Sequence, residues 1–221
     1  MTARITFEHE LQVLHNDLKK MGIMIEGAID CCMEAFENQD EVLAREVIAG
    51  DRMINDMEKT IETECLSLIL KQQPVARDLR AVSTALKVVT DMERIGDHAA
   101  DIADLIQRMK GKPPVYRLVQ HIPEMARVAK QMVKEALEAF VTGDIDAAKD
   151  IIPRDDVVDE LFNNVKLEVV HLLQDSSEHA DECVDVLMIA KYMERIGDHA
   201  VNICEWTEFG KTGVLQDVRI L

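Results

Sequence analysis

The segments DMERIGDHAAD (residues 91–101) and YMERIGDHAVN (residues 192–202) decide how this chain folds. In both segments, carboxylate or amide side chains recur at every fourth position. Because residues four apart stack along one face of an α-helix, each segment predicts a helix with one acidic face. Their near identity predicts that one structural unit is used twice.

A second match supports this internal duplication. The segment EAF at residues 34–36 reappears at residues 138–140, an offset of 104 residues, whereas the acidic segments are offset by 101. One connection in the second unit is therefore three residues shorter. The strongest break in the chain is GKPP at residues 111–114, because glycine and proline disfavour a continuing helix. We therefore expect two domains, residues 1–111 and 112–221.

Apolar residues recur every three or four positions along most of the chain, which is the pattern of amphipathic α-helices. In the first unit they predict helices over residues 7–37, 43–68 and 74–110, with Asp40 as an N-cap of the second. No segment indicates a strand. Helices of about 30 residues would each be about 45 Å long, and short turns between them favour antiparallel packing. The predicted fold is all-α, with two tandem three-helix bundles related by duplication.

Composition limits the class of function. The chain has 42 acidic and 25 basic residues and a formal net charge of −17, which disfavours nucleic acids and anionic lipids as partners. Its apolar runs are too short to cross a bilayer, and its start has no signal-peptide core. We therefore expect a cytoplasmic protein that does not insert into membranes. Its five cysteines include no Cys-x-x-Cys pair and are expected to be reduced and mostly buried.

The acidic segments indicate cation binding. Like charges four residues apart on a helix repel each other, and bound cations would offset that cost. The helix before each segment carries a second pair of oxygen-bearing side chains at the same spacing. The candidate ligands are Asp51, Asn55, Glu93, Asp97 and Asp101 in the first unit and Asp155, Asp159, Glu194, Asp198 and Asn202 in the second. Such oxygen ligands without thiolates suit iron, manganese, magnesium or calcium more than zinc.

The segment QPVARDLR at residues 73–80, together with ERIGD at residues 93–97 and 194–198, resembles the PhoU family of phosphate-signalling regulators. The resemblance covers nearly the whole chain. It implies tandem three-helix bundles whose acidic motifs hold divalent or trivalent metal ions as multinuclear clusters, iron among them. It also implies a negative regulator that links the high-affinity phosphate transporter, through its ATPase subunit, to a membrane sensor histidine kinase. Membrane association would be indirect, and long exposed helix faces lead us to expect a homodimer.

Two features depart from the family pattern. Asn55 and Asn202 place neutral amides where carboxylates are expected, so they neutralise less cation charge. The segment PVARDLR at residues 74–80 occurs once, and its counterpart in the second unit is DSSEHAD at residues 175–181. The two units are therefore not expected to share every partner.

A local group of basic residues stands out in this acidic chain. Arg77, Arg80 and Lys87 lie within eleven residues of one another. The resemblance would make them a partner-binding patch. Ordinary ion pairing with Asp78 and Asp91 is an equal alternative.

Histidine and glycine follow the same duplication. His98 and His199 come directly after acidic residues and therefore point about 100° away from them on a helix. We expect them to pack or form hydrogen bonds rather than bind metal. Gly96 and Gly197 lie mid-helix, at a cost of about 1 kcal/mol relative to alanine. Close approach of a neighbouring helix would explain them, and room for a cluster is the alternative.

Three other functions compete with metal-dependent regulation. A solvated acidic face, flanked by Arg94 and Arg195, would make the protein a metal-free interaction bundle. Helical bundles with paired Glu-x-x-His motifs can instead house di-iron oxidation chemistry, but the chain has one such spacing, Glu168 to His171, without an equivalent in the other unit. No order of residues indicates nucleophilic catalysis. We therefore expect no enzyme, and a di-metal oxidoreductase ranks last.

Overall fold

The computed structural model describes residues 2–109, 115–215 and 218–219. Its elements are α1 (Thr2–Asn38), α2 (Glu41–Gln72), α3 (Arg77–Arg108), η1 (Val115–Leu118), α4 (Ile122–Thr142), α5 (Ile145–Ile151), η2 (Ile152–Arg154), α6 (Asp155–Asp175), α7 (Ala180–Thr212), β1 (Val214–Leu215) and β2 (Val218–Arg219). The all-α prediction is confirmed. A two-residue antiparallel ladder between β1 and β2 is an addition that the sequence pattern did not indicate. The expected domain boundary after residue 111 lies outside the described residues.

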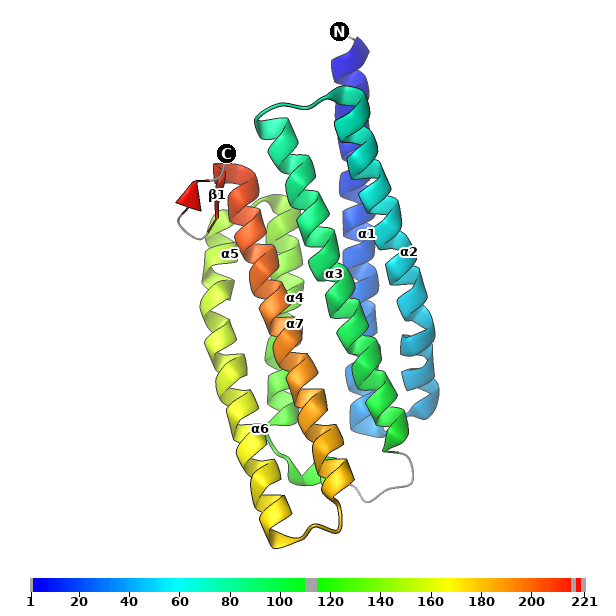
Figure 1. The fold of residues 1–221 in the computed structure, drawn as a ribbon, viewed down its shortest axis with the longest axis vertical. Coiled ribbons are helices and arrows are strands. Elements are labelled where there is room, and N and C mark those ends of the chain that lie inside the picture. Colours follow the sequence, from blue (N-terminus) through cyan, green and yellow to red (C-terminus); the bar gives the residue numbers. More distant parts are fainter. Residues whose placement is uncertain (1, 110–114, 216–217, 220–221) are drawn as a thin grey trace.

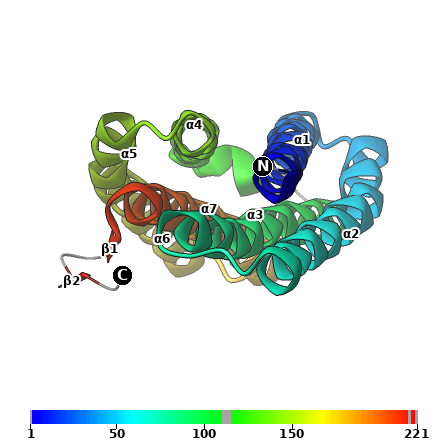
Figure 2. The same cartoon turned by 90° about the horizontal axis from the view of Figure 1, so that it is seen from above.

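The helices form two bundles that lie side by side (Figure 1). In the first, α1, α2 and α3 pack on one another, and in the second, α4, α6 and α7 pack together with the short α5. α3 and α7 run antiparallel, and their contact joins the bundles. Seen from above, α1 and α4 lie on one side of this pair (Figure 2). The buried apolar side chains form one core that extends through both bundles.

The third helix begins at Arg77 and not at Pro74 as predicted. Gln73 and Ala76 adopt positive φ angles of 46° and 47°. Because a left-handed backbone cannot continue into a right-handed helix, the chain changes direction between these residues. The N–H of Gln73 closes α2 by donating to the carbonyl of Ile69 at 3.1 Å.

The second bundle also departs from the expected helix length of about 30 residues. α4 and α6 have 21 residues each. α4 begins only after the 3-10 turn η1, and Pro153 separates α5 from α6. Proline lacks a backbone N–H and its ring clashes with the preceding turn, so the chain passes through the 3-10 turn η2. The equivalent residue in α2 is Ala49, where the helix continues unbroken.

Aspartates begin equivalent helices in the two bundles. Asp40 Oδ1 accepts hydrogen bonds from the backbone N–H groups of Val42 at 2.9 Å and Leu43 at 3.1 Å. Asp144 Oδ1 accepts one from the N–H of Ala147 at 3.0 Å. Such caps contribute about 1 kcal/mol to helix stability. The predicted cap at Asp40 is confirmed and has an equivalent in the second bundle.

The five cysteines are free thiols. Cys31 is half-buried, and Cys32, Cys65, Cys183 and Cys204 are buried. Burial raises the pKa of the Cys32 thiol to about 12. The prediction that the cysteines are mostly buried is therefore confirmed.

Apolar side chains face inward along every long helix. Met21, Met92, Met125 and Met132 are among the largest fully buried side chains, so methionine fills much of the core. In the part of the chain that the structure describes, no helix has a stretch that is long and apolar enough to cross a bilayer.

Candidate metal-binding site

Two glycines set the distance between the helices that carry the acidic side chains. A Cβ atom on Gly96 of α3 would lie 3.0 Å from Ile54 Cδ1 of α2. A Cβ atom on Gly197 of α7 would lie 3.0 Å from Asp155 Oδ1 of α6. Both distances are shorter than ordinary contacts between heavy atoms. The glycines therefore admit a neighbouring helix, as expected, and Gly197 also leaves room for a candidate ligand.

The first acidic face lies between α2 and α3. Burial, and then the charge of Asp97, raises the pKa of Asp51. Burial, and then the charges of Asp97 and Asp51, raises the pKa of Glu93. Asn55 Nδ2 donates to Asp51 Oδ2 at 2.9 Å. Within the described residues, Asp51 Oδ1 and Asn55 Oδ1 are buried without a hydrogen-bond partner. The structure thus brings Asp51, Asn55, Glu93 and Asp97 together.

Glu58 belongs to the first acidic face as well, although the sequence analysis did not single it out. Burial and the charge of Glu93 raise the pKa of Glu58 to about 7. Glu58 follows Asp51 by seven residues, so it continues the same stripe of α2, and this spacing was the signal that could have found it. Arg94 supplies a countercharge, because its guanidinium lies 2.9 Å from Asp97 Oδ2 and 3.5 Å from Glu93 Oε2.

The second acidic face lies between α6 and α7. Burial, and then the charges of Asp198, Asp159 and Glu194, raises the pKa of Asp155 to about 6. Asp155 Oδ1 is buried without a hydrogen-bond partner among the described residues. Glu194 forms an ion pair with Lys191 of the same helix. The four predicted acids therefore influence one another, and Lys191 would compete with a bound cation for Glu194.

Asp101 and Asn202 lie where α3 meets α7, away from the centres of the acidic faces. Asn202 Nδ2 donates to Asp91 Oδ1 at 2.9 Å, and His199 Nδ1 lies 2.8 Å from the same oxygen. Asp101 Oδ2 lies 3.6 Å from His98 Nδ1. The structure therefore does not bring Asn202 to the second face, because its amide is engaged by Asp91. The charge of Asp101 contributes to the raised pKa of Asp51 on the first face.

The two histidines pack between the bundles. The His98 ring stacks on Tyr192, with 5.4 Å between the ring centres, and lies 5.6 Å from the ring of His199. Packing and hydrogen bonding were predicted, and both are observed. The carboxylate bound by His199 is Asp91, which was not among the candidate ligands.

The three basic residues of α3 have different surroundings. Lys87 Nζ lies 5.9 Å from the centre of the Trp206 ring on α7. Arg80 Nε is buried without a hydrogen-bond partner within the described part of the chain. Arg77 lines a pocket at the end of the bundles. Asp91 Oδ1 is engaged by His199 and Asn202 of α7, so this oxygen serves the contact between α3 and α7.

The Glu168-x-x-His171 spacing serves the start of α4. Glu168 Oε2 accepts a hydrogen bond from the N–H of Gln120 at 3.0 Å, and Oε1 lies 2.9 Å from His121 Nδ1. Glu168 therefore holds the segment that leads into α4. This role favours a structural explanation of the spacing.

The donor set of the acidic faces suits a hard cation. Asp51, Asn55 and Asp155 each keep a buried oxygen without a hydrogen-bond partner among the residues described, and carboxylate and amide oxygens are ligands of hard cations. In residues 2–109, 115–215 and 218–219, however, no three His, Cys, Asp or Glu side chains converge closely enough to hold a metal ion. Cation binding would therefore require the carboxylates to reorient and to release Arg94 and Lys191.

The duplicated bundles with matching acidic faces correspond to a known domain. The PhoU domain matches the chain twice, over residues 18–106 and 122–207. The chain belongs to the PhoU family. A PhoU homologue of Clostridium acetobutylicum, described as a phosphate-specific transport system accessory protein, is 42% identical over 99% of both chains. PhoU of Escherichia coli K12, with the same description, is 34% identical over 96% of this chain and 87% of its own.

Two crystal structures of PhoU proteins share the fold. PhoU from Pseudomonas aeruginosa superimposes with a TM-score of 0.90, is 31% identical, and covers 94% of this chain and all of its own. The phosphate transport system regulatory protein PhoU from Streptococcus pneumoniae has a TM-score of 0.87 and 27% identity, over 96% of this chain and all of its own. The resemblance inferred from the acidic segments is therefore confirmed, as is the tandem-bundle fold.

Proposed function

We propose that this protein is an accessory regulator of phosphate transport that acts through protein contacts. The proposal rests on the end-to-end match to relatives described as phosphate-specific transport system accessory proteins. By the family resemblance, it negatively regulates high-affinity phosphate uptake by contacting the ATPase subunit of the transporter and a membrane sensor histidine kinase. We place it in the cytoplasm, as a homodimer that reaches the membrane through these partners.

Deleting the gene tests the regulatory proposal. A strain without the protein, grown with abundant phosphate, is expected to keep phosphate uptake and phosphate-regulated gene expression high. Uptake of radiolabelled phosphate and a reporter fusion measure the two effects, and re-expression of the wild-type chain should reverse both. Normal repression in the deleted strain would contradict the proposal.

We further propose that each acidic face binds metal ions, with iron favoured. Asp51, Asn55, Glu93 and Asp97 would hold them in the first bundle, and Asp155, Asp159, Glu194 and Asp198 in the second. A bound cation would neutralise the carboxylates whose burial and mutual repulsion raise their pKa values. The side chains of the protein supply oxygen ligands from two helices of each bundle, so binding would fix α2 against α3 and α6 against α7.

Metal content tests the second proposal. Protein purified without added metal is analysed by elemental mass spectrometry, alongside a Glu93→Gln/Asp97→Asn variant and a Glu194→Gln/Asp198→Asn variant. Each variant is expected to lose the metal of its own bundle, while a control that removes two exposed charges elsewhere, Glu37→Gln/Asp181→Asn, should retain all of it. Unchanged metal content in both test variants would rule out these ligands.

A metal-free interaction bundle is the second candidate. Arg94 already neutralises part of the first acidic face and Lys191 part of the second. If the wild-type protein lacks metal but deletion of the gene still raises phosphate uptake, the hypothesis of a metal-free adaptor is correct. Oxygen-dependent turnover by metal-loaded protein would instead support the oxidoreductase alternative.

A further inference from the structure

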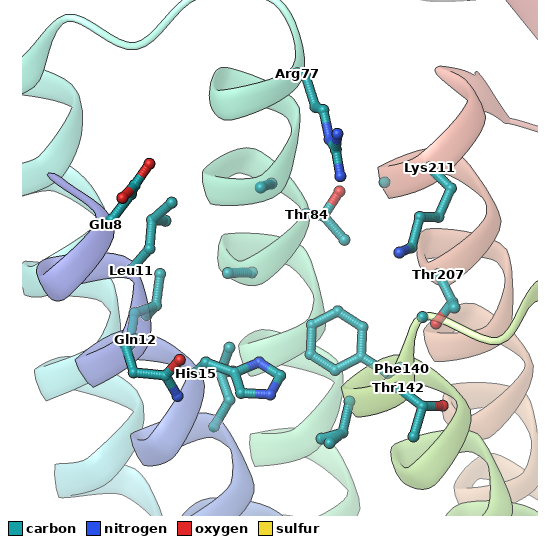
Figure 3. Close-up of a pocket in the computed structure, with 17 residues that line it drawn as sticks. Glu8, Leu11, Gln12, His15, Arg77, Thr84, Phe140, Thr142, Thr207 and Lys211 are labelled. Carbon is teal, nitrogen blue, oxygen red and sulfur yellow. The ribbon is translucent and has the colours of Figure 1, made fainter. Parts of the chain in front are cut away.

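A pocket of about 460 Å³ lies at the end of the molecule where α1, α3, α4 and α7 meet (Figure 3). It is separate from both acidic faces. Its apolar lining includes Leu11, Leu14 and Leu18 of α1 and Phe140 of α4. The volume falls in the range that small-molecule sites usually have. The pocket can therefore hold the apolar body of a small ligand.

Thr84 lines this pocket, and its buried hydroxyl lies against Gly210 of α7, where a Cβ atom would be 3.2 Å from Oγ1. Its side chain is 3% exposed, and its Oγ1 has no hydrogen-bond partner among the described residues. The hydroxyls of six other helical threonines donate to the carbonyl four residues before them, namely Thr60, Thr63, Thr90, Thr142, Thr207 and Thr212. For Thr84 that carbonyl belongs to Arg80, which already accepts from Ser83 at 3.0 Å. Because an unpaired buried hydroxyl is costly, it points to a missing partner.

Two cations frame the same space. Arg77 extends from the start of α3 and Lys211 from the end of α7, and both reach toward Thr84 (Figure 3). Neither side chain makes an ion pair or hydrogen bond with another residue in the part of the chain that the structure describes. In a chain with a net charge of −17, two unpaired cations in one pocket are notable. Their charge favours an anion beside the Thr84 hydroxyl.

The side chain of Lys211 lies against Gly143, where α4 ends. Gly143 ends α4 with a φ of 68°, and a Cβ atom there would lie 2.5 Å from Lys211 Nζ. The positive φ favours glycine at this position, and the absence of a Cβ atom leaves the space that the end of Lys211 occupies. The end of α4 also carries partial negative charge, which attracts the lysine. This attraction alone could explain the position of Lys211, so the test must separate a helix-stabilising role from a ligand-binding one.

The remaining polar side chains do not cancel the positive charge beside Thr84. Burial, and then the charge of Lys19, lowers the pKa of His15, so this residue is neutral near pH 7. Glu8, the acidic residue of the lining, lies on the α1 side of the pocket, away from Lys211 (Figure 3). The anionic end of a ligand would thus lie between α3 and α7, and its apolar body would extend toward α1 and Phe140.

We propose that this pocket binds a small organic anion, in which a phosphate or carboxylate group is attached to an apolar body. Arg77 and Lys211 bind the anionic group, the Thr84 hydroxyl turns from Gly210 to donate a hydrogen bond to it, and the apolar lining formed by α1 and α4 binds the body. The site is independent of metal binding at the acidic faces. Two sources of such a ligand, a nucleotide and a single-chain lipid phosphate, share this chemistry.

Isothermal titration calorimetry of the full-length protein tests the proposal with two probes, adenosine monophosphate and octyl phosphate. At least one is expected to bind with a Kd below about 1 mM, and the probe that binds identifies the source. Inorganic phosphate, which lacks the apolar body, should bind at least about tenfold more weakly. No binding of either probe, or equal binding of inorganic phosphate, would overturn the proposal.

Point variants locate the site. Arg77→Gln and Lys211→Gln are each expected to weaken binding of the probe about tenfold, because each removes a charge-assisted hydrogen bond. Arg45→Gln removes the same charge near the start of α2, and α2 begins at the end of the molecule opposite the end of α7 (Figure 1), so this control should have no effect. If Lys211→Gln lowers the melting temperature but leaves affinity unchanged, the lysine only stabilises α4 and the assignment fails.

Thr84→Val gives a second readout that does not depend on the cations. Valine has nearly the same shape and lacks the hydroxyl, so the ligand-free variant should melt at a higher temperature than the wild-type protein. The same variant should bind the probe more weakly. A lower melting temperature without ligand would show that the hydroxyl has an internal partner, which contradicts the proposal.

Discussion

The two acidic faces carry the same motif but have different neighbours. On the first face, Glu58 adds another carboxylate, and Arg94 contacts both Glu93 and Asp97 of α3. The residue of α6 equivalent to Glu58 is Phe162, 104 positions later, and Lys191 Nζ lies 5.3 Å from the centre of its ring. The duplication therefore reproduced the geometry of the helices, whereas the charge balance of each face was set by residues outside the motif.

The largest expected effect comes from the packing under the two faces. Ile54→Ala should lower the free energy of unfolding by about 3 kcal/mol, because Ile54 is 3% exposed and fills the space opposite Gly96. The equivalent Val158→Ala should cost about 1 kcal/mol less, since valine has one methylene fewer. Urea denaturation followed by circular dichroism measures both. Equal losses of unfolding free energy would show that the two helix pairs are packed equally tightly at these positions.

The glycines should respond less strongly and with a different sign. Gly96→Ala should destabilise the protein by about 1 kcal/mol, because the new methyl group meets the packed side chain of Ile54. Gly197→Ala should be neutral or stabilising by up to about 1 kcal/mol, because the Asp155 carboxylate can rotate away and alanine favours the helix. The same denaturation experiment measures both changes. A greater loss at Gly197 would mean that Asp155 is fixed in place.

The two faces should also titrate in different pH ranges. The folded protein raises the pKa of Glu58 from 4.5 to about 7 and that of Asp155 from 3.8 to about 6. The folded state therefore binds more protons, and each contribution to stability is fully present below the ordinary pKa and is lost as the pH rises through the folded one. Both side chains are partly exposed, so solvent screening limits each contribution to below about 1 kcal/mol.

A single amide substitution tests the upper of these two pH ranges. In metal-free protein, Glu58→Gln should flatten the fall in stability toward pH 7. Thermal melts at half-unit pH intervals measure this, with Glu37→Gln as an exposed control. If the melting curve of Glu58→Gln keeps the pH dependence of the wild-type protein, the first face does not hold a protonated glutamate.

The smallest expected effect concerns the countercharges. Arg94→Gln should strengthen cation binding to the first face by up to about tenfold, and Lys191→Gln should strengthen binding to the second by about threefold. The first effect is larger because Arg94 contacts two candidate ligands, whereas Lys191 is paired with Glu194. Titration with manganese, followed by calorimetry, compares them. Weaker manganese binding after either substitution would show that the arginine or lysine side chain helps to arrange the carboxylates for binding.

The helical pattern and the motif spacing predicted most of the architecture. Apolar residues at three- and four-residue steps depend on local geometry, so the helices, the Asp40 cap and the glycine contacts followed from the chain itself. The starts of α3 and α4 did not, because the positive φ of Ala76 and the turn η1 leave no periodic signal. Pro153 could have predicted the break between α5 and α6. The match between the two units instead favoured one continuous helix, as in α2.

Some of the candidate ligands could be placed from the sequence, and others could not. Spacing placed Asp51 and Glu93 on helix faces that meet, because adjacent antiparallel helices in a short-turn bundle have few alternatives. Asn202 has the spacing of the second acidic face, yet its amide binds Asp91. Spacing specifies the face of a helix within about a quarter turn, and the neighbouring helix decides which side of that face is covered.

By itself, the sequence determined that this protein is a duplicated helical bundle of the PhoU family with an acidic motif in each half, because periodicity and repeats are properties of the chain. Only the tertiary structure decided which acids meet, which are paired with Arg94 or Lys191, and that Arg77, Thr84 and Lys211 share one pocket. The physical reason is the antiparallel contact of α3 and α7, which brings together side chains more than 100 residues apart. No local sequence pattern predicts that contact.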